Sequence, residues 1–232
     1  MRVKGRGNLV TEADLAVEAR IQAIIEAEYP SHAILSEETR SHTSTAGWVW
    51  VIDPIDGTRN FVSGIPFFCT NIALCLNGVT QLALTYEPNR REEFLAVRGR
   101  GLRVNGRPAF ASRKDSVRES VLGFDAGYDD VRGRRALEMA LAIWPGVQAV
   151  RIPGSAALGL AYAACGRFDV FVHHMLYPWD IAAGLLLIEE GGGVIVDRDG
   201  GPASLSTDGV AAGGRAVVAD LLRLTAGRPW RD

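Results

Sequence analysis

The segment Asp53-Pro54-Ile55-Asp56-Gly57-Thr58 has the residue types and spacing best suited to chemistry, and it directly follows the apolar run Trp48 to Ile52. Proline fixes one backbone angle and glycine permits a tight turn, so both carboxylates can point at one place beyond a strand end. Clustered carboxylates need a cation, and without Cys or His at hand their hard oxygen atoms favour Mg²⁺ over Zn²⁺. The alternative is an ordinary turn, because Asp, Pro and Gly are also common turn residues.

Two further acidic positions stand next to apolar runs. Glu37-Glu38 follows Ala33 to Leu35, so it lies at the end of an element. Asp180 precedes the apolar run Ile181 to Ile188, and taken alone it is predicted to be a helix N-cap.

These segments together resemble the inositol monophosphatase family. The resemblance covers about Asn8 to Val196 and rests on four segments: Leu9 to Asp14, Ser36-Glu37-Glu38, Trp50 to Phe61, and Trp179 to Gly184 followed by Glu190-Gly191-Gly192. It implies an α/β protein, α+β in its N-terminal half and α/β in its C-terminal half, with the layered αβαβα sandwich shared with fructose-1,6-bisphosphatase. It also implies a Mg²⁺-dependent phosphomonoesterase that forms a homodimer.

The resemblance implies roles for individual residues. Glu37, Asp53 and the Ile55 carbonyl would hold a first metal ion, and Asp53, Asp56 and Asp180 a second, within a set of two or three Mg²⁺ ions per site. Glu37 and Thr58 would position and polarise the attacking water, with Asp14 hydrogen-bonded to the Thr58 hydroxyl. Substrate contacts are expected from these residues: Asp56, Gly57, Thr58, Gly154, Ser155, Ala156 and Asp180.

Some candidates have a structural alternative. Ser155 can be a helix N-cap as well as a substrate contact. His173 and His174 are adjacent on a predicted strand and point to opposite faces, so they make a poor chelate. Where His173 stands, inositol-specific members of the family often carry Glu. Cys69 and Cys75 are predicted to pack as small apolar groups, and Arg59 is predicted to be a solvated residue of an exposed turn.

The elements that must position these residues follow from pattern. Thr11 is expected to cap a helix that ends near Tyr29-Pro30, and the run from Trp48 to Ile52 reads as a strand covered on both faces that breaks at Asp53-Pro54. Asn77-Gly78 and Asn105-Gly106 predict hairpins in an antiparallel meander. Beyond Ser112, strands are expected at 120–124, 147–151, 169–172 and 193–196, and helices at 132–143, from 155, at 180–190 and near 216–225. We expect two halves, residues 1–111 with the metal-binding loop and residues 112–232 completing the active site.

Composition excludes several classes. The 232 residues carry a net charge of −2 with 47% hydrophobic residues, so disorder and a concentrated basic face for nucleic acid are not expected. No apolar run approaches the ~20 residues of a membrane helix, and three Cys without a C-x-x-C pair suggest a reducing compartment. The expected location is the cytoplasm, with no nucleic-acid or membrane partner. Family members carry a helix before the segment that matches Leu9 to Asp14, and most of that helix is expected to be missing here.

The leading hypothesis is Mg²⁺-dependent hydrolysis of a small-molecule phosphate monoester, nominally inositol 1-phosphate. Fructose 1,6-bisphosphate, histidinol phosphate and 3′-phosphoadenosine 5′-phosphate are alternative substrates. A different-class alternative is a non-catalytic regulatory or RNA-polymerase-associated binding protein on the same fold.

Overall fold

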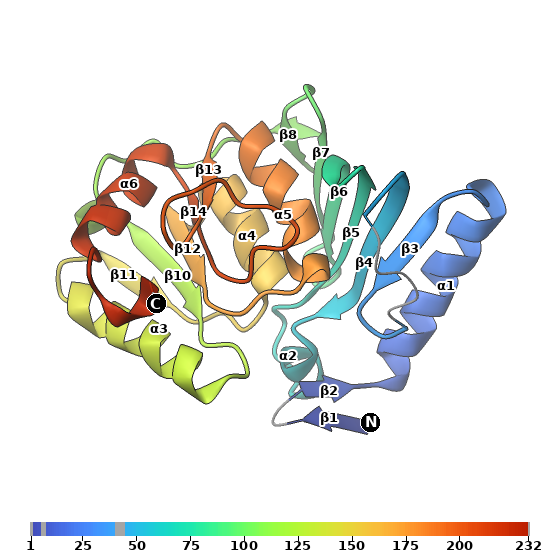
Figure 1. Ribbon diagram of the computed structural model, residues 1–232, viewed down its shortest axis with the longest axis horizontal. Coiled ribbons are helices and arrows are strands. Elements are labelled where there is room, and N and C mark those ends of the chain that lie inside the picture. Colours follow the sequence, from blue (N-terminus) through green and yellow to red (C-terminus); the bar gives the residue numbers. More distant parts are fainter. Residues whose placement is uncertain (1, 6–7, 40–44, 232) are drawn as a thin grey trace.

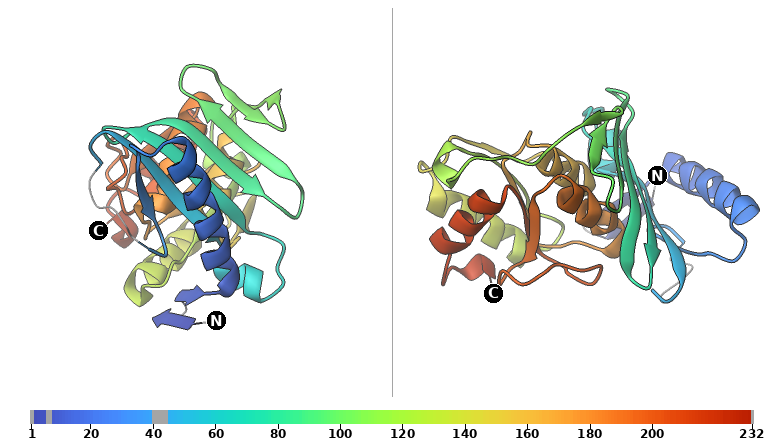
Figure 2. Two further views of the ribbon diagram at one scale, coloured as in Figure 1. Left: turned by 90° about the vertical axis from the view of Figure 1, so that its right-hand side faces the viewer. Right: turned by 90° about the horizontal axis from the view of Figure 1, so that it is seen from above.

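The chain forms five layers in the order helix, sheet, helices, sheet, helices (Figure 1). The computed structural model describes residues 2–5, 8–39 and 45–231. The two sheets and the central helices between them are seen from above in Figure 2. The expected αβαβα sandwich is therefore confirmed.

The first sheet has seven strands in the order β3-β4-β5-β6-β7-β8-β9. Their bounds are Ala33–Ser36, Trp48–Asp56, Cys69–Leu76, Val79–Glu87, Glu92–Val97, Leu102–Val104 and Arg107–Pro108. From β4 to β9 each strand is antiparallel to the next, as the predicted meander requires. Asn77-Gly78 and Asn105-Gly106 form the hairpin turns with positive φ at all four residues.

The sequence predicted that the strand breaks at Asp53-Pro54, but β4 continues to Asp56. Asp53 pairs with Asn71 and Asp56 pairs with Cys69, so the β4 segment holds one residue more than its β5 partner and the pairing shifts at a β-bulge. Pro54 is accommodated inside this bulge. The bulge presents both aspartates at one end of a strand that stays anchored in the sheet.

Helix α1 (Glu12–Glu28) covers the outer face of β3 and β4 (Figure 2). Thr11 is its N-cap, as predicted, and forms a capping box with Asp14. Ile25 of α1 packs against Ile34 and Ile52 on this side of the sheet, whereas Val49 and Val51 belong to the core on the other side. Strand β4 is thus covered on both faces, as predicted.

The second sheet has the order β11-β10-β12-β14-β13. Its strands are β10 (Val121–Asp125), β11 (Ala149–Arg151), β12 (Val170–His173), β13 (Val194–Asp197) and β14 (Val210–Gly213). Strand β14, which the sequence analysis did not predict, lies antiparallel between β12 and β13. The predicted boundary near residue 111 falls between β9 and β10, and the division into two halves stays a prediction.

The helices of the C-terminal part lie on both faces of the second sheet. Helices α4 (Ala156–Ala164) and α5 (Pro178–Glu190) lie between the sheets, while α3 (Asp130–Ile143) and α6 (Arg215–Leu224) cover the outer face (Figure 1). Every residue of α4 is buried. A Cβ on Gly184 of α5 would lie 2.6 Å from Leu160 Cδ1, so glycine permits this close approach of α4 and α5.

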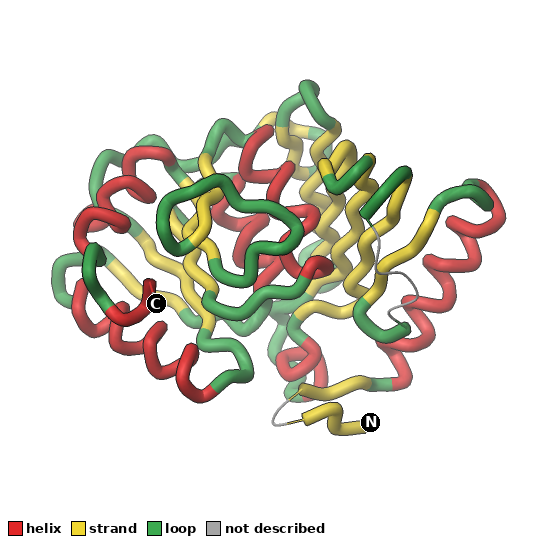
Figure 3. Tube along the Cα trace, viewed as in Figure 1, coloured by secondary structure: helices red, strands yellow, loops and turns green. Residues whose placement is uncertain are grey.

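Shorter elements complete the fold. They are β1 (Arg2–Gly5), β2 (Asn8–Val10), α2 (Thr58–Val62) and the 3₁₀ turns Val117–Glu119 and Pro229–Arg231. The loop between β13 and β14 crosses in front of the central helices (Figure 3), and its Leu205 packs into their core. Within the described residues no helix is both long and apolar enough to cross a membrane.

Candidate active site

Three acidic residues meet where the first sheet and the central helices come together. Asp53 and Asp56 stand at the end of β4, and Asp180 lies in the first turn of α5. Carboxylate oxygen atoms of the three lie within 4.8 Å of one another. They line a cavity of about 320 Å³ together with Glu37, which follows β3, and Ile55. The structure thus brings all five predicted metal-holding residues to one cavity.

The helix that carries Asp180 begins earlier than predicted. Pro178 occupies its first turn and Tyr177 is the N-cap, so the expectation that Asp180 is the N-cap is wrong. Asp180 is instead the third helical residue, and its Oδ2 accepts a hydrogen bond of 2.7 Å from the Tyr177 N–H. This bond orients the carboxylate towards β4.

The acidic cluster is electrostatically strained without a cation. Burial, followed by the charges of Glu37, Asp56 and Asp180, raises the pKa of Asp53 well above its ordinary value. Burial also raises the pKa of Asp56 and of Asp180. Asp53 is 2% exposed, and its Oδ1 has no hydrogen-bond partner among the described residues. A buried and unpartnered carboxylate oxygen among like charges is what a bound cation stabilises.

The donor atoms of the cluster are oxygens and fit a hard divalent ion. Cys69 Sγ lies 3.9 Å from Asp56 Oδ2, but burial raises the pKa of this thiol well above its ordinary value, so it is not a thiolate ligand. Carboxylate and carbonyl oxygens favour Mg²⁺ among the common divalent ions. As predicted, Cys69 and Cys75 are both buried in the core.

Thr58 connects the metal-binding loop to helix α1. Its hydroxyl donates to the Ile55 carbonyl at 3.0 Å, and Asp14 Oδ1 lies 3.5 Å from the same hydroxyl oxygen. Asp14 is fully buried and its other oxygen accepts the Thr11 N–H at 2.8 Å. The structure therefore brings together Asp14 and Thr58, as the resemblance implied, with the shorter bond going to Ile55.

Ser155 is the N-cap of α4, but its hydroxyl caps no backbone N–H and donates instead to Asp56 Oδ2. The Ala157 N–H donates to the same oxygen at 2.8 Å. The start of α4 thus holds the Asp56 carboxylate in place. Gly57 is needed at this junction, because its φ is +93° and a Cβ would lie 3.1 Å from Ser155 Cβ.

Two residues that the sequence analysis missed hold the turn before α4. Asn60 Nδ2 donates to the Pro153 carbonyl at 2.8 Å and to the Phe67 carbonyl at 2.7 Å. Asp125, at the end of β10, accepts the Gly154 N–H through both oxygens at 3.0 and 3.2 Å. Burial raises the pKa of Asp125 to about 7. The only available signal for Asp125 was that it directly follows the strand predicted at 120–124, which in the structure extends to Asp125.

The outer wall of the cavity is partly aromatic. The Arg59 guanidinium lies 4.7 Å from the centre of the Tyr128 ring, in a cation–π contact. Both residues line the cavity, with Ile152, Met175 and Trp179. Arg59 is exposed, as predicted, but it lies in helix α2 rather than in a turn, and it contacts Tyr128. Tyr128 carried no signal in the sequence.

The two adjacent histidines point to opposite faces, as predicted. His173 lines the cavity, whereas the His174 ring packs edge-on against Trp230, with ring centres 5.4 Å apart. Burial lowers the pKa of His173 to about 3 and that of His174 to about 4, so both are neutral near pH 7.

An αβαβα sandwich with a carboxylate cluster at the ends of β3, β4 and α5 defines a metal-dependent hydrolase class. The chain matches the model of the inositol monophosphatase family over residues 2–226. It is 38% identical to an inositol monophosphatase of Dictyostelium discoideum, covering 97% of this chain and 85% of that protein. It is also 38% identical to the Nus factor SuhB of Escherichia coli (strain K12), covering 94% and 83%.

Solved structures agree with this assignment. The inositol monophosphatase of Anabaena (Nostoc) sp. PCC 7120 superposes with a TM-score of 0.88 at 36% identity, covering 96% of this chain and 89% of that chain. The protein belongs to the inositol monophosphatase family. It is a phosphatase of that family, and its acidic cluster is typical of the family's metal site.

Proposed function

We propose that the protein hydrolyses phosphate monoesters of small alcohols with Mg²⁺, inositol 1-phosphate being the reference substrate. The observation that carries this proposal is the buried cluster of Asp53, Asp56 and Asp180, whose Asp53 Oδ1 has no hydrogen-bond partner among the described residues. The family membership supports the same reaction class.

The proposed metal ligands divide into two groups. Glu37, Asp53 and the Ile55 carbonyl would hold one Mg²⁺ ion, and Asp53, Asp56 and Asp180 a second. When bound, two or three such ions would neutralise the phosphate oxygens and lower the pKa of the attacking water. The Ser155 hydroxyl and the Ala157 N–H fix the shared Asp56 carboxylate for this purpose.

The remaining roles concern water and substrate. Glu37 and Thr58 orient the attacking water, and Asp14 acts as a positioning residue for the Thr58 hydroxyl. The backbone N–H groups of Gly57 and Thr58 donate to the phosphate, at the start of α2. Asp56 and Asp180 lie next to the bound ester at the metal site. Gly154, Ser155 and Ala156 contact the alcohol part of the substrate.

The test measures inorganic phosphate released from inositol 1-phosphate by the purified protein, with Mg²⁺ and with EDTA. Release that requires Mg²⁺ supports the proposal. A folded protein that releases no phosphate from any small monoester, at any Mg²⁺ concentration, overturns it.

A regulatory role is the second candidate. The relatives named Nus factor SuhB are as similar to this chain as the inositol monophosphatase of Dictyostelium discoideum is, so the similarity alone does not separate catalysis from a role in transcription. An intact set of acidic residues is what a working catalyst requires and a binding surface does not. The homodimer, the cytoplasmic location and the absence of a nucleic-acid partner stay predictions.

A further inference from the structure

The segment that joins β12 to α5 sets the place of the Asp180 carboxylate. It runs from His174 to Tyr177, and the Tyr177 N–H donates to Asp180 Oδ2 at 2.7 Å. In return, the Asp180 N–H donates to the Tyr177 carbonyl at 3.0 Å. A movement of this segment therefore moves the carboxylate.

Two arginines from different elements bind one carbonyl group of the segment. Arg132 of α3 donates to the His174 carbonyl through Nη1 at 3.2 Å. Arg198, the first residue of the β13–β14 loop, donates to the same oxygen through Nη2 at 2.7 Å. A carbonyl oxygen has two lone pairs, so the two guanidinium groups can fill both. Hydrogen bonds from charged donors are roughly twice as strong as those between neutral groups, and this carbonyl accepts two of them.

Asp208 connects the two arginines and also holds the segment directly. Its Oδ2 lies 2.7 Å from Arg132 Nη1, and its Oδ1 lies 3.0 Å from Arg198 Nη1. Its backbone carbonyl accepts the Leu176 N–H at 2.9 Å. The end of the β13–β14 loop is thus bound to the segment through both its side chain and its backbone.

The Arg198 side chain occupies space that a glycine leaves open. A Cβ on Gly209 would lie 2.4 Å from Arg198 Nε and 2.5 Å from its Nη2. The Arg198 side chain is 19% exposed, and its backbone carbonyl accepts the Arg231 Nε–H at 2.6 Å. Arg198 is therefore fixed at its backbone and at its guanidinium group.

The acidic cluster gives such support a purpose. The charges of Asp56 and Glu37 repel the buried Asp180 carboxylate. In the metal-free protein this repulsion favours movement of the carboxylate away from the cluster. A fixed backbone keeps the ligand in place, and a ligand that is already in place loses less conformational entropy when a metal ion binds.

We propose that a clamp outside the cavity positions Asp180 for metal binding. The clamp consists of Arg132, Arg198 and Asp208, and it ties α3 and the β13–β14 loop to the segment before α5. Its members do not line the cavity, so they act as positioning residues through the backbone from His174 to Tyr177. This inference rests on the proposed phosphatase function.

Amide hydrogen exchange tests the clamp in the metal-free full-length protein. Arg198→Met removes the charged donor and keeps an unbranched side chain. The Tyr177 N–H is expected to exchange about tenfold faster in this variant, as the loss of one charged hydrogen bond implies. Amides of α4, which is buried throughout, should keep their wild-type rates. An unchanged rate at Tyr177, or an equal acceleration in α4, overturns the local positioning role.

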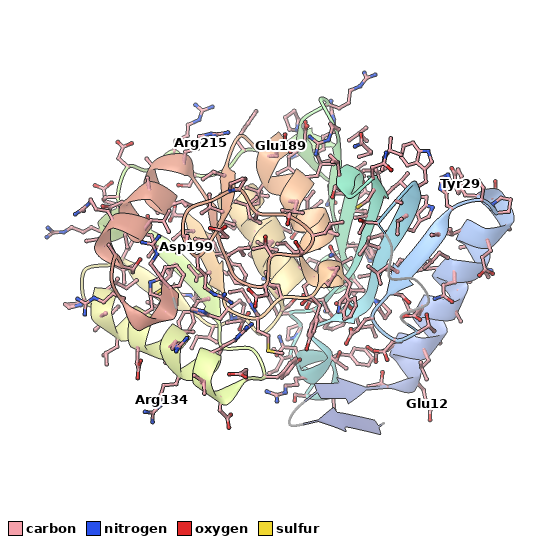
Figure 4. The ribbon with its side chains drawn as sticks, viewed as in Figure 1. Glu12, Tyr29, Arg134, Glu189, Asp199 and Arg215 are labelled. Atoms are coloured by element: carbon pink, nitrogen blue, oxygen red, sulfur yellow. The ribbon has the colours of Figure 1, made fainter. Side chains whose placement is uncertain are left out.

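Titration calorimetry with Mg²⁺ tests the consequence for metal binding. Arg198→Met is expected to weaken Mg²⁺ binding by about tenfold, the lower end of the effect of removing an outer partner of a metal ligand. Gly209→Ala should weaken it in the same direction, because the new Cβ displaces the guanidinium group without removing its charge. Arg134→Met is the matched control, since Arg134 is an exposed residue of α3, labelled in Figure 4, and its loss changes the net charge equally.

Activity separates the clamp from the proposed function. With inositol 1-phosphate as the probe, saturating Mg²⁺ should restore the wild-type kcat to Arg198→Met, because the clamp acts on metal affinity. If the wild type hydrolyses the ester and Arg198→Met binds Mg²⁺ as tightly as Arg134→Met does, the clamp is overturned and the phosphatase function stands. If the wild type binds no Mg²⁺, the proposed function and the role of the clamp both fail.

Discussion

Asp53→Asn changes the metal site with the least disturbance of the fold, since Asn matches Asp in volume. Asp53 is 2% exposed, and its pKa is raised by burial and by Glu37, Asp56 and Asp180. The substitution removes a ligand that both proposed metal ions share. We expect kcat/KM to fall by at least ~10³-fold, which corresponds to about 4 kcal/mol of transition-state stabilisation.

Thermal melting separates this loss from misfolding. Mg²⁺ at about 100 times its Kd stabilises the wild type by about 2.7 kcal/mol, which for a chain of this size raises Tm by about 5 to 11 °C. In Asp53→Asn we expect most of this rise to disappear. The metal-free variant should melt no lower than the metal-free wild type, because a buried charge has been removed.

The matched control is Asp199→Asn, an exposed carboxylate on the loop after β13, labelled in Figure 4. It should retain both the activity and the Tm rise of the wild type. If Asp53→Asn keeps more than about a tenth of the Mg²⁺-dependent activity, a loss of under 1.4 kcal/mol, the assignment of Asp53 as a shared ligand is refuted.

Three further predictions concern the surroundings of the cluster. The folded-state pKa values of Asp53, Asp56 and Asp180 are raised, so the metal-free protein should lose stability as pH rises above the ordinary pKa of 3.8. Chemical denaturation at several pH values measures this loss, and saturating Mg²⁺ should abolish it. If the free energy of unfolding depends on pH equally with and without Mg²⁺, the cluster is not the metal site. Ser155→Ala removes a hydrogen bond to Asp56, so titration calorimetry should show an affinity for Mg²⁺ about 10- to 100-fold weaker. Unchanged affinity would contradict the role of Ser155 in positioning the Asp56 carboxylate. Gly184→Val places a Cβ 2.6 Å from Leu160 Cδ1 and should destabilise the fold by about 1 to 3 kcal/mol, measured as a lower Tm. If the variant melts at the wild-type temperature, α4 and α5 can move apart and the close approach is not required.

Local patterns predicted most of the elements. Thr11 and the apolar spacing after it predict α1, and the Asn-Gly pairs predict hairpins, because both signals act through neighbouring backbone atoms. Strand β14 was missed because three of its four residues, Ala211, Ala212 and Gly213, have weak strand propensity. Its place depends on distant packing, since a Cβ on Gly213 would lie 2.9 Å from Val170 Cα.

The carboxylates of the metal cluster could be predicted, whereas several of the residues that surround them in the cavity could not. The residue types around Asp53 and Asp56 indicated a cation site, whereas Asp180 alone predicted a helix N-cap and its place among the ligands came only from the family resemblance. Asp125 and Tyr128 reach the cavity only because β10 lies beside β12 in the second sheet, a pairing that no local signal encodes. The start of α5 was misplaced by two residues although Pro178 is a typical first-turn residue.

The most direct test of the account is phosphate release from inositol 1-phosphate, histidinol phosphate, fructose 1,6-bisphosphate and 3′-phosphoadenosine 5′-phosphate, each assayed with Mg²⁺ and with EDTA. The account predicts release from at least one ester that EDTA abolishes and added Mg²⁺ restores. Release that is unaffected by EDTA, or none from any ester by folded protein, would contradict the claim that the carboxylate cluster is a catalytic metal site.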